Sequence, residues 1–201
     1  MKKMIALVMV IVAMASFKPE GGYKVGDKAT DFKLKNIDGK MVSLADNKDA
    51  KGYIVVFTCN HCPFAKKYED RIIALDKKYK GKGYPVVAIN PNDPGQSPED
   101  DYAGMKVRAK DKGFTFPYLV DESGKIAAAY GAAHTPHVFI LKKEGANFVV
   151  KYIGAIDDNS DDATAVKEKY AENAIDNLLA GKPVNPETTK AVGCTIKWKQ
   201  S

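Results

Sequence analysis

The stretch that decides the fold is "VVFTCNHCPF", residues 55–64, where an apolar run leads into two cysteines three positions apart. The run that feeds it, "YIVVFT" (53–58), is continuous and apolar, which is typical of a strand buried on both faces of a sheet. From Pro63 onward, apolar residues recur at three- and four-residue spacing until "KGKG", which predicts a helix. A second apolar run, "YPVVAIN" (84–90), follows. Strand, helix and strand in this order predict two parallel strands joined by a right-handed crossover.

The rest of the chain extends this unit into an α/β fold, with a central mixed β-sheet and helices on both faces. Turn residues between alternating runs predict hairpins, and three-to-four spacing predicts helices. In chain order we expect a hairpin over 31–44 that turns at Asp38-Gly39, a helix from Ser97 through Lys112, a short strand and short helix within 114–131, an antiparallel hairpin over 137–154, and a final helix over 161–181 with Gly181 as its C-cap.

The first fifteen residues, "MKKMIALVMVIVAMA", have the pattern of a secretory signal peptide. The lysines come first, an apolar run follows, and the small-residue pattern Ala13-Met14-Ala15 ends it. A retained anchor is the alternative, but the run is short for ~30 Å of hydrocarbon. We therefore expect a signal peptide at 1–15, a linker at 16–22, one domain at 23–182 and a C-terminal tail at 183–201. The protein is predicted to be exported, periplasmic or secreted, with no membrane association after signal cleavage.

Charge and cysteine content narrow the function classes. The net charge is +6, but lysines alternate with acidic residues, so no concentrated nucleic-acid-binding stripe is present. Three cysteines are too few for a scaffold held together by disulfides. In an exported protein, a CxxC pair is thus more suited to reaction than to structural cross-linking.

The cysteine pair has three interpretations: a redox dithiol, half of a metal site, or two buried thiols. On the first turn of a helix, Cys59 and Cys62 would lie roughly 5 to 6 Å apart at Cα, within reach of a disulfide. Cys59, at the strand-to-helix junction, would be held as a thiolate by the helix dipole and would be the attacking sulfur. Cys62, more buried, would be the resolving sulfur. A protonated His61 would lower the pKa of Cys59 further and make the disulfide a better oxidant.

With "HTPH" about 75 residues downstream, "VVFTCNHCPF" resembles the thioredoxin superfamily. The stretches "VVAINPND", "FTFPYLVDESGKIAAAYG", "YIGAIDDN" and "GCTIKWK" are similar to its redoxin branch, which is related to alkyl hydroperoxide reductase and thiol-specific antioxidant proteins. The resemblance extends from about Tyr23 to Lys199. It implies a thioredoxin fold with an N-terminal β-hairpin extension. It also implies a thiol-disulfide oxidoreductase that needs no cofactor beyond its redox-active disulfide and exchanges with protein or small-molecule thiols and an upstream redox partner.

The resemblance further implies that Pro136 is a cis-proline facing the dithiol and that Thr135 offers backbone groups to an extended substrate. This chain departs from the common thioredoxin site, with Thr58 in place of tryptophan and Asn60-His61 in place of Gly-Pro. A histidine directly before the second cysteine makes the motif similar to that of disulfide isomerases and periplasmic oxidases. The Pro-Thr-x-x-Cys signature of peroxide reduction is absent, so direct peroxidase activity is not expected.

Two further classes stay open on the same fold. If the cis-proline loop abuts the cysteines, then Cys59, Cys62, His134 and His137 form a ligand set suited to zinc or copper, as in a metal-binding chaperone. His134 and His137 are an odd number of residues apart, so in a strand their side chains point to opposite faces. This favours His134 alone facing the cysteines, as an electrostatic or proton-transfer partner. A catalytically silent redoxin that only binds partners is the other class.

The third cysteine, Cys194, has two interpretations. It is either a buried small residue in a docked tail, where Trp198 packs the tail down, or a third thiol that exchanges with the dithiol.

Overall fold

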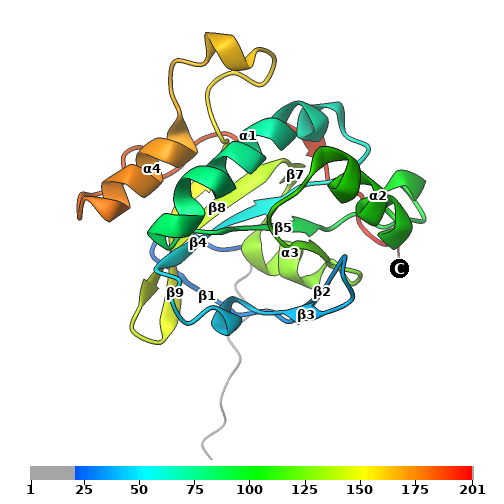
Figure 1. The fold of residues 1–201 in the computed structure, drawn as a ribbon, viewed down its shortest axis with the longest axis horizontal. Coiled ribbons are helices and arrows are strands. Elements are labelled where there is room, and N and C mark those ends of the chain that lie inside the picture. The colour runs from blue at the N-terminus through cyan, green and yellow to red at the C-terminus, as the bar shows by residue number, and fades with distance from the viewer. Residues whose placement is uncertain (1–20, 201) are drawn as a thin grey trace, which may run out of the picture.

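An eight-stranded mixed sheet organises the computed structural model, which describes residues 21–200 (Figure 1). The predicted signal peptide and residues 16–20 of the linker lie outside the described residues. Strands β4, β5 and β6 are parallel to one another, and every other pair in the sheet is antiparallel. Across the sheet the order is β1 (Lys28–Ala29), β9 (Asn147–Gly154), β8 (His137–Glu144), β4 (Gly52–Phe57), β5 (Val86–Asn90), β6 (Tyr118–Val120), β2 (Leu34–Asn36) and β3 (Met41–Val42). The parallel pair and both hairpins predicted from the sequence are confirmed.

Helices cover both faces of this sheet, as predicted. Strand β4 shows why, because its successive side chains point to opposite faces. Ile54 and Val56 belong to a core cluster shared with α1 (Pro63–Tyr79), α2 (Tyr102–Lys112) and α4 (Tyr170–Leu179). Val55 and Phe57 belong to the opposite cluster, with α3 (Lys125–Tyr130) and the N-terminal segment. The central strands are thus buried on both faces, which is the reason for the continuous apolar runs.

Two helices begin later than the sequence pattern predicts. The helix expected from Ser97 is split into a 3-10 turn, Pro98–Asp100, and α2, which Asp101 caps by accepting a hydrogen bond from Gly104 N at 2.6 Å. The helix expected over 161–181 begins only at Tyr170. Polar side chains compete with helix formation in the residues before it: Asp162 accepts bonds from the Thr164 amide and hydroxyl. A 3-10 turn, Ala163–Ala165, forms there instead.

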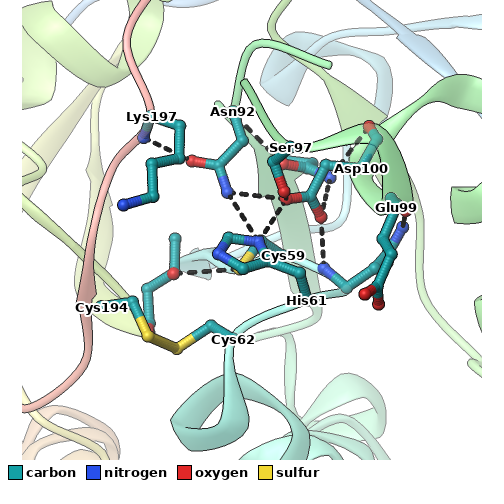
Figure 2. A network of polar contacts seen from close by, with 12 residues as sticks. Cys59, His61, Cys62, Asn92, Ser97, Glu99, Asp100, Cys194 and Lys197 are labelled. Atoms are coloured by element: carbon teal, nitrogen blue, oxygen red, sulfur yellow. Dashed lines mark hydrogen bonds and ion pairs between the residues drawn. A yellow bond between two sulfur atoms is a disulfide. The ribbon is translucent and has the colours of Figure 1, made fainter. Parts of the chain in front are cut away.

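The C-terminal tail is docked onto the domain. Its strand β10 (Cys194–Thr195) pairs antiparallel with β7 (His134–Thr135) in a separate two-stranded sheet. Ile196 is buried in the core, and the Trp198 indole lies against Gly124. The tail therefore reaches the end of β4, where the cysteine pair lies (Figures 1 and 2).

Among the described residues, no helix combines the length and apolar character needed to span a membrane.

Candidate active site

The CxxC segment is a loop between β4 and α1. Strand β4 ends at Phe57, and α1 begins at Pro63 with Cys62 as its N-cap. Proline is well placed in that first helical position, where its missing N–H costs nothing. Cys59 lies outside the helix, so the prediction that both cysteines share its first turn is wrong. The N-terminus of α1 therefore lies at Cys62, whereas the sequence pattern predicted it at Cys59.

Cysteine pairing also differs from the expected closure of Cys59 with Cys62. A disulfide joins Cys62 to Cys194, with Cα atoms 6.0 Å apart and 132 residues between them in sequence. Cys59 is a free and buried thiol beside it (Figure 2). Cys194 is thus not a free cysteine that packs as an inert apolar residue. The assignment of Cys59 as attacking sulfur and Cys62 as resolving sulfur stays a prediction.

Thr135 lies against both members of the CxxC pair. The Thr135-Pro136 peptide bond is cis, as the resemblance implied. Cys59 Sγ is 3.1 Å from Thr135 Oγ1, and Cys62 Sγ is 3.3 Å from the Thr135 carbonyl oxygen. The segment before β8 therefore lies against the cysteines at Thr135, and the predicted cis bond of Pro136 is confirmed. The role of Thr135 in binding an extended substrate stays a prediction.

A buried carboxylate, that of Asp100, organises the other side of the cysteine loop (Figure 2). Its oxygens accept hydrogen bonds from Asn60 N at 2.6 Å, Ser97 Oγ at 2.7 Å and Asn92 Nδ2 at 2.9 Å. His61 Nδ1 lies 2.6 Å from Asp100 Oδ2. Asp100 is not among the site residues predicted from the sequence, because "SPEDD" has the pattern of a helix start and nothing in it indicates contact with the cysteines. A buried acid so close to a histidine and a cysteine is a candidate functional residue.

Electrostatics around Cys59 oppose the predicted thiolate. Burial, and after it the Asp100 carboxylate, raise the pKa of Cys59 to about 11, although the Thr135 hydroxyl and backbone N–H groups act in the opposite direction. Burial would also raise the pKa of Asp100, but hydrogen bonds from Asn92, Ser97, Asn60 and His61 bring that pKa below its ordinary value. The site thus holds a carboxylate beside a thiol that is protonated at neutral pH.

Asn60 braces the loop rather than facing open solvent. Its side-chain nitrogen donates to the Glu99 carbonyl oxygen at 2.7 Å, and its side-chain oxygen accepts from Tyr118 OH at 3.0 Å. Thr58, also predicted as a supporting residue, extends the strand pairing by donating its N–H to the Ile89 carbonyl oxygen at 2.9 Å. Both residues position the cysteine loop on the sheet.

The proposed zinc or copper set does not assemble. Cys62 Sγ is bonded to Cys194, and among residues 21–200 the one group of three potential ligands is Cys59, His61 and Asp100. His137 begins β8, where its ring packs on Phe139 with centroids 4.7 Å apart. Burial lowers the pKa of His137 to about 4, so it is neutral. The metal interpretation based on these two histidines is therefore wrong for this structure.

His134 lies on β7, in register with Thr195 of the tail strand. Its Nδ1 atom is buried and has no hydrogen-bond partner among the described residues. No hydrogen bond joins it to either cysteine of the motif in that part of the chain. Its role as a partner of the cysteines stays a prediction.

Comparisons with known proteins place the chain in a family. The model of the AhpC/TSA family matches residues 25–156. The chain is 30% identical over 129 residues to the thiol-disulfide oxidoreductase ResA of Bacillus cereus, an alignment that covers 64% of this chain and 70% of the relative. Relatives so named support a redox enzyme activity.

Solved structures agree with this placement. An uncharacterized conserved protein from Geobacillus kaustophilus is 39% identical, with a TM-score of 0.81 over 89% of this chain and 94% of that one. A putative thiol:disulfide interchange protein DsbE from Chlorobium tepidum is 25% identical, with a TM-score of 0.53 over 63% of this chain and 84% of that one. The family match covers more than half of the sequence, so this chain is a thioredoxin-fold member of the AhpC/TSA family.

Proposed function

We propose that the protein is a thiol-disulfide oxidoreductase that acts on partner thiols and disulfides through Cys59 and Cys62. The observation that carries the proposal is the position of both sulfurs against Thr135, beside the cis-proline, with one sulfur free and the other in a disulfide. The similarity to ResA, which is named for this activity, supports the same chemistry.

The reaction begins with a dithiol and a substrate disulfide. The Cys59 thiolate attacks one substrate sulfur, forms a mixed disulfide and displaces the other substrate sulfur, which takes up a proton. The Cys62 thiolate then attacks the Cys59 sulfur, which releases the second substrate thiol and leaves a Cys59–Cys62 disulfide. Two electrons have passed to the substrate. A reducing partner restores the dithiol by the reverse sequence.

His61 is the group that we assign to proton transfer. A ring nitrogen of His61, a carboxylate oxygen of Asp100 and Cys59 Sγ all lie within 4.8 Å of one another. With Nδ1–H donating to Asp100, Nε2 is the basic atom of the ring. A thiol whose pKa is about 11 needs such an acceptor to become a nucleophile at neutral pH.

Reduction of insulin by dithiothreitol tests this function. We expect the wild-type protein to accelerate the reaction and Cys59→Ser to lose the acceleration, because the attacking sulfur is gone. Val192→Ser, a substitution on the exposed part of the tail, is the matched control and should act as wild type. If Cys59→Ser reduces insulin as fast as wild type, the assignment of Cys59 is wrong. If wild type gives only the background rate, the silent binding protein is the better interpretation.

We also propose that the protein is exported. The lysine-bearing start, the apolar run and Ala13-Met14-Ala15 support this, and an intrachain disulfide suits an oxidising compartment. N-terminal sequencing of the protein from a bacterial periplasmic or secreted fraction should give a mature chain that begins near Ser16. An intact N-terminus on protein found only in the cytosol would contradict export.

A further inference from the structure

The backbone edge beside the reactive cysteines is already paired with this chain's own tail. In the register of β10 on β7, Cys194 lies opposite Thr135 and Thr195 opposite His134. Ile196 N continues the pairing by donating to the Ala133 carbonyl oxygen at 3.2 Å. The tail thus lies where an extended polypeptide would add a strand next to the cysteines.

The tail sequence fits this edge closely. At Gly193, any side chain would overlap with the Thr135 carbonyl group and the Pro136 nitrogen, so glycine permits the approach of the two backbones. On the other side of Cys194, Lys197 N donates to Asn92 Oδ1 at 2.9 Å, and the Lys197 carbonyl accepts from Asp93 N at 2.8 Å. The tail is therefore held on both sides of its cysteine, and Asn92 links it to the Asp100 network (Figure 2).

The seated tail coincides with a sheltered thiol. Cys59 is only 2% exposed and Cys62 is fully buried, and Cys194 packs on the cluster that these two form with Ala65. A partner disulfide has no access to Cys59 Sγ in this arrangement. Cys59 and the Cys62–Cys194 disulfide, however, meet at one residue, Thr135.

We propose that Cys194 is a third redox residue of the site and that β10 is the internal partner of the Cys59/Cys62 pair. This rests on the proposed function. The Cys59 thiolate attacks the Cys62 sulfur of the Cys62–Cys194 disulfide. A Cys59–Cys62 bond forms, the Cys62–Cys194 bond breaks, and the electron pair leaves with the Cys194 sulfur, which takes up the proton that Cys59 lost. No electrons enter or leave the protein.

The exchange interconverts two isomers of the oxidised enzyme. In the closed isomer, Cys62 is tied to the tail and Cys59 is reduced and sheltered. In the open isomer, the Cys59–Cys62 disulfide is formed and β10 is no longer covalently held, so β7 becomes available to an extended partner. A reducing protein that pairs with β7 meets its substrate disulfide only in the open isomer.

Disulfide mapping of the full-length mature protein tests the exchange. Samples equilibrated over a range of glutathione redox ratios are quenched with acid, alkylated and analysed by peptide mass spectrometry. We expect two oxidised species: Cys62–Cys194 with Cys59 alkylated, and Cys59–Cys62 with Cys194 alkylated. Either species alone at every ratio would overturn the proposal, because the tail disulfide would then be absent or merely structural.

Gly193→Ala tests the role of the tail strand without removing a thiol. The added methyl group should displace β10 and shift the ratio of isomers toward Cys59–Cys62 by about tenfold, as expected when one or two backbone hydrogen bonds are lost. Val192→Ala, at an exposed neighbouring position, is the control and should keep the wild-type ratio. An unchanged ratio in Gly193→Ala would overturn the role of β10. Because this readout needs no external substrate, it is separate from insulin reduction, whose loss would count against the proposed function instead.

Discussion

Asp100→Asn should lower the pKa of Cys59, because it removes the negative charge that faces the thiolate. An Asp100 carboxylate oxygen lies within 4.8 Å of Cys59 Sγ, and its charge is the second cause, after burial, that raises the pKa of Cys59 to about 11. Asparagine keeps the shape and an acceptor oxygen for Asn60 N–H. The substitution therefore changes the charge more than the packing.

The size of the effect follows from Coulomb's law. Two unit charges 4.8 Å apart in an effective dielectric of about 20 repel by about 3.5 kcal/mol, or about 2.5 pKa units, before screening by neighbouring groups is taken into account. Asp100 is screened by its hydrogen bonds and by His61, and burial is the larger cause of the raised pKa, so we expect a fall of about 1 unit. Burial, which remains, keeps the thiol pKa above its ordinary value.

A Cys62→Ser/Cys194→Ser background offers an assay for this prediction. Cys59 is the one cysteine that remains in that sequence, so the rate of iodoacetamide labelling against pH reports the pKa of Cys59 alone, with and without Asp100→Asn. Asp101→Asn is the matched control: it removes the same charge one residue away at an exposed position, and asparagine caps a helix as well as aspartate does. A Cys59 pKa that is unchanged or higher in Asp100→Asn, or an equal fall in Asp101→Asn, would refute the electrostatic argument.

Three further predictions concern stability and proton transfer. The pKa of Asp100 is lower in the folded protein than its ordinary value, so the ionised carboxylate stabilises the fold above about pH 4, and this stabilisation is lost as pH falls toward the folded pKa. Urea unfolding at a series of pH values should show the loss in wild type and much less of it in Asp100→Asn. His61→Asn should reduce the insulin-reduction rate by roughly 100-fold, because the ring that accepts the Cys59 proton is gone, whereas an unaltered rate would exclude proton transfer by His61. Ile54→Ala should lower the free energy of unfolding by about 2 to 5 kcal/mol in urea titration, while Val107→Ala, on an exposed helix face, should change it by less than about 1 kcal/mol; equal effects would contradict the core assignment.

Periodicity was enough to predict the central fold. The runs at 53–58 and 84–90 are apolar because both faces of β4 and β5 are covered, and this local signal does not depend on distant residues. Helix starts were less predictable. In the segment before Tyr170, acidic and amide side chains accept hydrogen bonds from nearby backbone N–H groups, and the Asp157 carboxylate accepts from Arg71, which a pattern of apolar residues does not reveal.

The pairing of Cys62 with Cys194 was beyond the reach of local reasoning. Spacing alone favours Cys59 as the partner, whereas the observed pairing depends on how a tail 132 residues away crosses β7. The pKa of Cys59 could not be predicted locally either. A cysteine within the first turn of a helix would have a lowered pKa, but α1 begins at Pro63 and the loop buries Cys59 next to Asp100.

The most direct test of the central claim is to trap the reaction at its first step. Reduced Cys62→Ser lacks the resolving sulfur, so a mixed disulfide with a protein disulfide substrate should persist, and peptide mapping should place it on Cys59. Cys194 is also free in this variant and serves as an internal competitor. An adduct found chiefly on Cys194, or no adduct at all, would contradict the assignment of Cys59 as the attacking thiol.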